Sequence, residues 1–372
     1  MSSNTSTRPQ PVAPPLKLMA FNSSRQSRPS TIVTMQPTIP KGATSEQYPD
    51  GWTACLVDPC IVRQIHATPG FPRKLQRPPK KNYEIRPVDG KGLAMFATED
   101  IDVGELIVCE RPLVLVQTTV DLPDQLRNTN VELSEESLRQ AVITNLERRL
   151  ESLVDQMDAK FREQYLALVN AHHDGSGPLL GRLRTNGFAS PDFDIPDGGQ
   201  HRFSFVSNEM SRVNHSCCPN SEYSFDMSSF GMELRATRLI AKGTEISISY
   251  CDQTGLYSER QEALVSYDFT CDCPACKDHV SSDRFRKLLG GPLERILSNR
   301  KTTLDEVLRW IKRIEDFGLE STWAYVDCLQ FVEKKYQSKG KKEKVKYYRN
   351  KAYKHTLAIA GKAEALQSMI LP

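Results

Sequence analysis

The sequence contains no apolar run that approaches the roughly 20 residues required by a membrane-spanning helix. Its N-terminus also lacks the continuous hydrophobic segment of a secretory signal peptide. The sequence also lacks a large excess of either positive or negative residues, because it has 49 Lys and Arg and 46 Asp and Glu, for a formal net charge of +3. We therefore expect neither membrane insertion nor secretion, and the net charge gives no reason to expect direct binding of nucleic acid.

Acidic residues are missing from the N-terminal segment until Glu46. Residues 1–50 are rich in Ser, Thr, Pro and Gln, and such a segment cannot bury enough apolar surface to fold alone, which predicts a disordered tail. A mitochondrial transit peptide is the lesser alternative, because several prolines would interrupt its amphipathic helix. We expect a cytoplasmic or nuclear location.

Residues 51–82 are rich in Pro and Lys and predict an extended linker.

Short β-strands separated by Gly and Pro turns are expected from Tyr83 onwards. The expected strands are residues 83–86, 93–97, 106–109 and 113–116, and β character returns over residues 203–250. Between about 121 and 185 the apolar period becomes helical after a helix start at Ser134, which predicts a helical insertion.

The C-terminal region, residues 281–372, is expected to be helical, with apolar residues at helical spacing around 304–314, 323–331 and 343–359. It carries a run of lysines, for which the ordinary interpretation is a solvated helix face. A basic RNA-associated adaptor and a nuclear localisation signal are the alternatives. The lysines are Lys334, Lys335, Lys339, Lys341, Lys342, Lys344 and Lys346.

Four separated segments carry candidate chemistry. Gly90-Lys91-Gly92 alone indicates a hairpin turn, and Asn214-His215-Ser216-Cys217-Cys218-Pro219-Asn220 alone indicates a polar turn. The run from Glu245 to Tyr250 indicates a strand that ends in an aromatic residue. Cys271-Asp272-Cys273-Pro274-Ala275-Cys276 brings three thiols within six residues, and tetrahedral zinc needs a fourth ligand from elsewhere.

In this order the four segments resemble the SET methyltransferase family, and more narrowly its SMYD-like branch, over roughly residues 85–280. The resemblance implies an α+β fold of short curled sheets with a pseudoknot, a helical insertion and a C-terminal helical extension. It places the SET domain at residues 83–255 and a post-SET zinc segment at residues 256–280.

The resemblance implies a protein-lysine N-methyltransferase that uses S-adenosylmethionine. The residues that it implies for donor contacts are Gly90, Lys91, Gly92, Asn186, Asn214, His215, Tyr250 and Phe269. It implies that the Tyr250 hydroxyl acts at the methyl-transfer site, whereas the plainer interpretation is a strand aromatic with a satisfied hydroxyl. The implied partner is a protein that carries the target lysine, histone or not, and we expect a monomer. The alternative is an inactive SET-fold protein that binds zinc and serves in interactions.

The resemblance also implies the zinc ligands. They are Cys217, Cys271, Cys273 and Cys276, with Cys218 as the competing candidate for the first position.

Three departures from the family pattern are visible. The Cys/His array of a MYND finger is missing, because residues 98–200 contain only Cys109, His172 and His173. Asp89 stands where the family often has an arginine, which leaves one contact with the donor carboxylate unassigned. No Gly-x-Gly-x-x-Gly pattern joins a strand to a helix, so a Rossmann-type methyltransferase is not supported.

Overall fold

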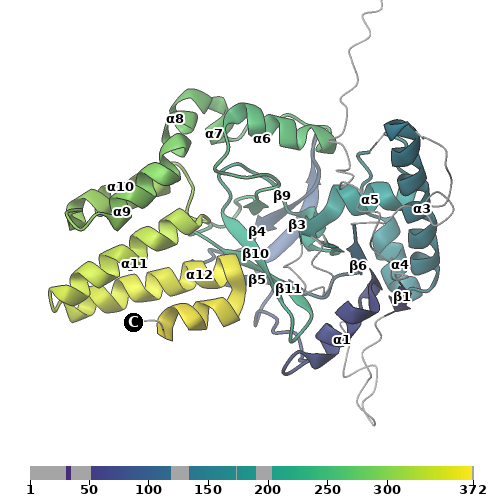
Figure 1. Cartoon of the computed structure of the whole chain (residues 1–372), viewed down its shortest axis with the longest axis horizontal. Coiled ribbons are helices and arrows are strands. Elements are labelled where there is room, and N and C mark those ends of the chain that lie inside the picture. Colours follow the sequence, from purple (N-terminus) through teal and green to yellow (C-terminus); the bar gives the residue numbers. More distant parts are fainter. Residues whose placement is uncertain (1–30, 35–51, 119–133, 173, 190–202, 371–372) are drawn as a thin grey trace, which may run out of the picture.

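The computed structural model describes residues 31–34, 52–118, 134–172, 174–189 and 203–370. Short sheets lie in the middle, helices from the central part of the sequence cover one side, and C-terminal helices extend on the other (Figure 1). The predicted α+β class is therefore confirmed. Within the described residues, no helix is both long enough and apolar enough to cross a membrane.

The described strands form four sheets. The largest has the order β1 (Thr31–Thr34), β2 (Ala54–Val57), β6 (Val114–Gln117), β8 (Phe203–Val206) and β7 (Gly187–Ala189). The second has the order β10 (Ser221–Asp226), β11 (Gly231–Ala236) and β5 (Leu106–Glu110). The two pairs are β3 (Tyr83–Val88) with β4 (Gly92–Ala97), and β9 (Asn214–His215) with β12 (Ser247–Ile248). The strands expected between residues 83 and 116 are all present.

The helical insertion packs on the largest sheet. It consists of α3 (Glu135–Asp155), α4 (Ala159–Leu166) and α5 (Pro178–Asn186), while residues 119–133 lie outside the described part. Ser134 caps α3 by accepting a hydrogen bond from the Ser137 backbone nitrogen, as expected for a helix start. The apolar stripe of α3 meets Leu56 and Val114 of the sheet, so β2 and β6 are covered on this face.

The prediction of an extended linker over residues 51–82 is wrong for the first half of that range. β2 is buried along its whole length, and it is followed by α1 (Pro59–Ala67). Asp58 caps this helix by accepting from the Cys60 backbone nitrogen at 2.7 Å, and Pro59 occupies the first turn. An Asp-Pro helix start after an apolar run is a local signal, which the Pro and Lys content of the following residues obscured.

The disordered tail predicted over residues 1–50 is also wrong at one place. Thr31–Thr34 form β1, which pairs antiparallel with β2 from Thr31 opposite Val57 to Thr34 opposite Ala54. The rest of this segment lies outside the described residues. A sheet edge supplies backbone hydrogen bonds to a segment that has no core of its own, so the composition of the segment does not reveal the pairing.

The C-terminal third is helical, as expected. After α6 (Tyr257–Leu264) and the short α7 (Pro274–Lys277) come α8 (His279–Leu289), α9 (Gly291–Ser298), α10 (Leu304–Asp316), α11 (Trp323–Ser338) and α12 (Lys342–Ile370). The long α12 is broken at Gly361, where φ is 82°. Phe285 of α8 stacks on Phe317 with ring centroids 4.7 Å apart. These helices thus have a core of their own beside the sheets.

We predict that removal of residues 1–50 destabilises the fold, whereas removal of residues 1–30 does not. The longer deletion removes the β1–β2 ladder and leaves the β2 edge open, which should lower the free energy of unfolding by about 1–3 kcal/mol for a few net hydrogen bonds. Urea unfolding of both truncated chains beside the full chain checks this. Equal stability of the three proteins would show that β1 contributes nothing.

Candidate functional site

The segment 214–220 lies alongside residues 245–250. β9 pairs parallel with β12, with Asn214 opposite Ser247 and His215 opposite Ile248. The Ser216 backbone nitrogen then donates to the Ile248 carbonyl at 2.9 Å. Two segments that are some 30 residues apart are therefore held in a fixed register, which the family resemblance requires but the spacing alone does not show. The strand expected from Glu245 to Tyr250 is shorter than predicted and covers only Ser247–Ile248.

Asn220 locks this pairing from the far end of the motif. Its amide nitrogen donates to the Glu245 carbonyl at 2.8 Å, and its side-chain oxygen accepts from the Ser247 backbone nitrogen at 2.8 Å. The side chain thus bridges two backbone groups of the 245–250 segment. Asn220 is buried, so loss of either bond would leave a desolvated polar group. Sequence reasoning assigned Asn220 no function.

Tyr250 lines a cavity of about 250 Å³ that is rich in aromatic side chains. Tyr267, Tyr223 and Phe188 line the same cavity, and the rings of Tyr250 and Tyr267 lie 4.9 Å apart. Tyr257, the other tyrosine close in sequence, stacks on His279 and does not line this cavity. The geometry therefore distinguishes Tyr267 from Tyr257, which sequence reasoning did not.

Tyr250 and His215 are linked to each other and to the backbone, and the Glu245 carboxylate also acts on Tyr250. Its hydroxyl donates to the Val213 carbonyl at 2.6 Å, and burial raises the pKa of the phenol above its ordinary value. The Tyr250 backbone nitrogen donates to His215 Nδ1 at 2.9 Å, while burial lowers the pKa of His215 to about 4. An acceptor at Nδ1 places the imidazole proton on Nε2, which lies 3.2 Å from Cys217 Sγ. Neither side chain is therefore set up as a base near neutral pH.

The Gly90-Lys91-Gly92 turn joins β3 to β4, and both glycines have a φ of 73°. A Cβ atom built on either glycine would meet no atom within 4 Å, so the turn borders open space. Lys91 Nζ lies 3.3 Å from Glu245, and the other Glu245 oxygen accepts from the Asn214 amide at 3.0 Å. The turn is thereby brought beside the start of the 214–220 segment, as the resemblance implies.

Phe269 and Asn186 occupy different surroundings. Phe269 is 38% exposed, and its ring lies 6.0 Å from that of His215, so one aromatic face remains available to a ligand. Asn186 ends α5 and lines the aromatic cavity. Its amide nitrogen donates to the Val169 and Arg182 carbonyls at 2.7 and 2.8 Å. A contact of Asn186 with a ligand is therefore left to its side-chain oxygen.

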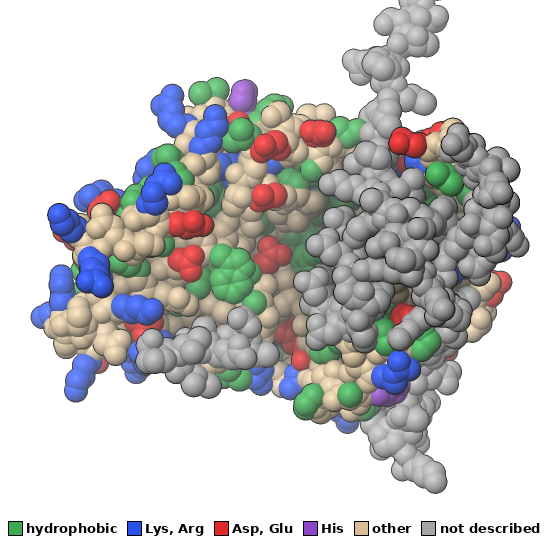
Figure 2. Space-filling model, in the orientation of Figure 1, with side chains coloured by type: hydrophobic (Ala, Val, Ile, Leu, Met, Phe, Trp, Pro, Cys, Tyr) green, Lys and Arg blue, Asp and Glu red, His purple; other side chains and the backbone are tan. Residues whose placement is uncertain are grey.

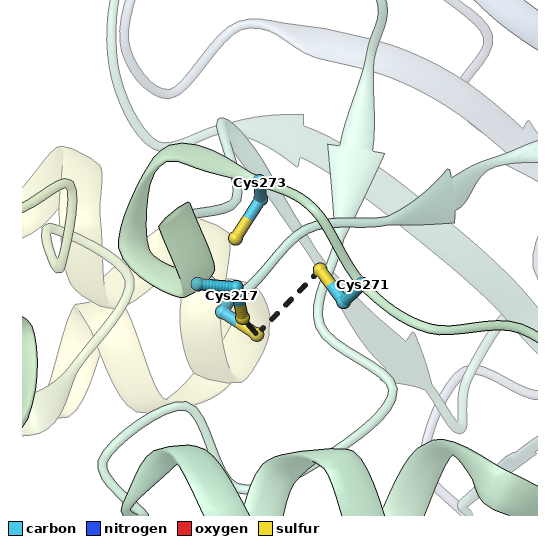
Figure 3. A group of neighbouring side chains, drawn as sticks. Cys217, Cys271 and Cys273 are labelled. Carbon is cyan, nitrogen blue, oxygen red and sulfur yellow. Dashed lines mark hydrogen bonds between the residues drawn. The ribbon is translucent and has the colours of Figure 1, made fainter. Parts of the chain in front are cut away.

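Four cysteine sulfurs lie within 4.8 Å of one another: those of Cys217, Cys271, Cys273 and Cys276. Cys217 Sγ is 3.9 Å from Cys271 Sγ and 3.5 Å from Cys276 Sγ, and the side chains of Cys217, Cys271 and Cys273 point toward one another (Figure 3). Tetrahedral zinc with bonds of 2.3 Å holds its sulfurs about 3.8 Å apart, so the residues fit the metal. Cys218, the competing candidate, lies 4.0 Å from Cys273 and is not in this group.

Side chains of α6 support the thiols, and sequence reasoning missed them. The Gln261 amide nitrogen donates to the Cys271 carbonyl at 3.2 Å and to Cys276 Sγ at 3.4 Å. Arg260 is fully buried and directs Nη2 at Cys276 Sγ, at 3.8 Å. A buried cation and an amide donor both favour a deprotonated sulfur, and hydrogen bonding with Cys217 lowers the pKa of Cys276.

The sequence analysis also did not identify Cys251 as a possible metal ligand. Its sulfur lies within 4.8 Å of His215 Nε2 or Nδ1 and of Cys217 Sγ, in a second group of possible metal ligands. Cys251 directly follows Tyr250, and its position in a strand run gives no metal-binding spacing. Of the two groups, the four-cysteine group fits tetrahedral zinc better, because such a site requires four ligands and this group supplies them.

The match to family models agrees with this geometry. Residues 92–251 match the model of the SET domain. The chain contains a SET domain. It is 26% identical over 207 residues to "Histone-lysine N-methyltransferase set5" of Schizosaccharomyces pombe, covering 55% of this chain and 53% of that protein. It is 32% identical over 111 residues to "N-lysine methyltransferase SMYD2-A" of Xenopus laevis, covering 29% of this chain and 24% of that protein.

The SET-domain chain thus spans about half the length of one of these curated relatives and about a quarter of the other. Among solved structures, the SET domain of LSMT bound to lysine and AdoHcy covers 79% of this chain and 96% of its own, at 11% identity and a TM-score of 0.30. The SMYD-like resemblance noted from the sequence is confirmed by the relatives.

We propose that the four-cysteine group binds one Zn²⁺, and predict that Cys273→Ser loses it while Cys251→Ser and Cys218→Ser keep it. Only the first change removes a sulfur that belongs to the tetrahedral set. Elemental analysis of the purified proteins should give about one zinc per chain for the wild type and the two controls. Chelation should also lower the thermal midpoint, because structural zinc contributes folding free energy. Full zinc content in Cys273→Ser would contradict the assignment.

Proposed function

We propose that the protein is a protein-lysine N-methyltransferase that transfers the methyl group of S-adenosylmethionine to a lysine side chain of another protein. The observation that carries the proposal is the aromatic cavity at Tyr250, beside the paired segments 214–220 and 245–250. The SET-domain match and the methyltransferase names of the relatives support it. The substrate protein is a histone or a non-histone protein.

The donor would lie between the Gly90–Gly92 turn and Phe269. The turn borders open space, and the backbone can approach a ligand there because neither glycine carries a side chain. The exposed face of Phe269 suits stacking on a planar base. Asn214 and His215 lie between these two features, linked to Glu245 and to the Phe269 ring respectively. When bound, the donor supplies a methyl group on a positively charged sulfur.

The aromatic cavity would receive the target lysine. A free lysine has a pKa near 10.4 and must lose a proton before its nitrogen can attack. Burial among Tyr250, Tyr267 and Tyr223 disfavours the ammonium and lowers that pKa. The cavity also excludes water and restricts the approach of the nitrogen to one line, which replaces a search in solution by a fixed geometry.

Tyr250 would orient the amine as a neutral phenol. Its hydroxyl is held by the Val213 carbonyl, so the oxygen presents its lone pairs in a fixed direction. Because burial raises the pKa of Tyr250, the hydroxyl keeps its proton near neutral pH and supplies alignment and electrostatics, with no covalent intermediate. The ring of Tyr267 packs against that of Tyr250, with centroids 4.9 Å apart.

We predict that Tyr250→Phe impairs methyl transfer far more than donor binding, and that Asn214→Ala impairs donor binding first. The Tyr250 hydroxyl would act on the transition state, so its loss should lower the rate of the methyl step about a hundredfold, or about 3 kcal/mol. Asn214 would hold the donor before reaction. Calorimetry measures the Kd of S-adenosylmethionine, and single-turnover transfer of a radiolabelled methyl group to lysate proteins measures the methyl step.

Tyr257→Phe is the matched control, since Tyr257 is a nearby tyrosine outside the cavity, and its transfer rate should equal that of the wild type. A wild-type rate for Tyr250→Phe would show that Tyr250 only packs, and Tyr267 would be the next residue to test. Tight donor binding by the wild type with no transfer to any protein would favour the inactive interaction protein instead.

We also predict the pH dependence of transfer. Between pH 7 and 9 the rate should rise with pH as the lysine amine loses its proton, because Tyr250 stays protonated throughout this range. Tyr250→Phe should therefore lower the whole profile without moving its midpoint. A shifted midpoint in this variant would show that the phenol itself titrates in the reaction.

A further inference from the structure

The excess of positive over negative residues is concentrated in one hairpin, residues 334–354, which we call the basic hairpin. It contains ten Lys and Arg and one acidic residue, Glu343. The rest of the chain then holds 39 Lys and Arg against 45 Asp and Glu, so it is net negative. The small net charge of the whole protein therefore hides a strong separation of charge.

The basic hairpin comprises the end of α11, a tight turn and the beginning of α12. The turn is fixed by backbone hydrogen bonds from Gly340 to Gln337 and from Lys341 to Tyr336, and Gly340 has a φ of 66°. Tyr336 and Tyr348 stack across the two helices with ring centroids 5.6 Å apart. The charged side chains are thus carried by a defined structure, and Lys and Arg gather at this end of the molecule (Figure 2).

Most of these cations have no acidic partner. Arg349 pairs with Glu333 and Lys351 with Glu315, at 2.7 and 2.8 Å. No other Lys or Arg of the basic hairpin forms an ion pair with a residue in the described part of the chain. The exposed lysines among them are Lys334, Lys339, Lys341, Lys342, Lys344 and Lys346. Glu343 is the one acidic residue among them, and an external anion would relieve the repulsion that remains.

A cleft of about 910 Å³ lies on this hairpin. Lys342, Lys346 and Arg349 line it at spacings of four and three residues, which place them on one face of α12, and Glu343 is the one acidic residue in the lining. The side chains of Gln337 and Asn350 also line it and can donate hydrogen bonds. Tyr347 lines the cleft too and is 56% exposed, so an aromatic face is available among the cations.

We propose that the basic hairpin binds the phosphate backbone of a nucleic acid without reading its sequence. Lysines are point charges that suit phosphates, and amide donors beside an exposed tyrosine suit phosphate, sugar and base contacts. An amphipathic acidic helix or a membrane surface would require an apolar stripe. Tyr347 is the only large hydrophobic side chain exposed in this hairpin, all of which the structure describes.

The length of the basic face fits several phosphates. From Lys342 to Arg349, α12 rises about 10 Å, and one strand of a duplex presents a phosphate every 3.4 Å along its axis, so about three phosphates lie within reach of this face. The hairpin residues line neither the aromatic cavity nor the four-cysteine group. Nucleic-acid binding is therefore separable from donor binding, and the proposal does not rest on methyl transfer.

Fluorescence anisotropy of the full chain with a labelled 20-base-pair DNA duplex and a labelled 20-nucleotide RNA tests the proposal. We expect binding of at least one probe, with affinity that falls as salt rises. Replacement of Lys339, Lys342, Lys344 and Lys346 by Gln should weaken binding at least tenfold at 50 mM salt. It should also flatten the slope of log K against log salt by about 3 to 4 units on the duplex, one for each lost phosphate contact.

Four exposed lysines elsewhere give the matched control: Lys74, Lys160, Lys287 and Lys301, each changed to Gln. This control removes the same net charge and should bind within twofold of the wild type. Equal loss in both variants would overturn the proposal, because binding would then follow the net charge alone. Absence of binding to either probe would overturn the proposal in favour of a solvated face. Binding to polyglutamate but to neither nucleic-acid probe would overturn it in favour of an acidic protein partner. Unchanged thermal midpoint and donor Kd in the hairpin variant show that the variant remains folded.

Discussion

The parallel pairing of β9 with β12 is the contact on which the rest of the site depends. The seven residues from Asn214 to Asn220 carry a candidate donor contact, a candidate metal ligand and the amide that locks the pairing. The carbonyl that accepts from Tyr250 belongs to Val213, directly before this segment. A shift of one residue would turn the side chains of Asn214 and His215 to the opposite face. It would also break the two hydrogen bonds of the Asn220 side chain. The donor, metal and substrate regions are thereby set by a single register.

The sequence predicts what depends on local spacing. The three clustered cysteines, the helix start at Ser134 and the strands from Tyr83 to Val116 are each specified within a few residues, and the structure has them. β1 is different, because its backbone partner is the edge of β2, some 20 residues away. Its composition could not reveal it.

The sequence predicts the motifs of the candidate site, but not the residues that hydrogen-bond to those motifs. Arg260 and Gln261 lie on a helix whose polar residues look like an ordinary exposed face, yet the fold turns them toward Cys276. A buried arginine is expensive unless it is paired, so its place beside thiols and Asp283 shows where the structure requires positive charge. No spacing rule relates these residues to the cysteine cluster, and only the three-dimensional fold brings them together.

The C-terminal helices are part of the site's support. Arg286 of α8 donates to the Cys217 carbonyl at 2.9 Å. Glu320, after α10, pairs with Arg238, which donates to the Cys218 carbonyl. Gly318, after α10, approaches Cys218 so closely that a Cβ atom there would lie 2.6 Å from the cysteine side chain. The helical region is thus packed against the 214–220 segment at one end and carries unpaired cations at the other. Because α10, α11 and α12 share a packed core between these ends, an anion held at the basic hairpin would lie in a fixed position relative to the SET domain.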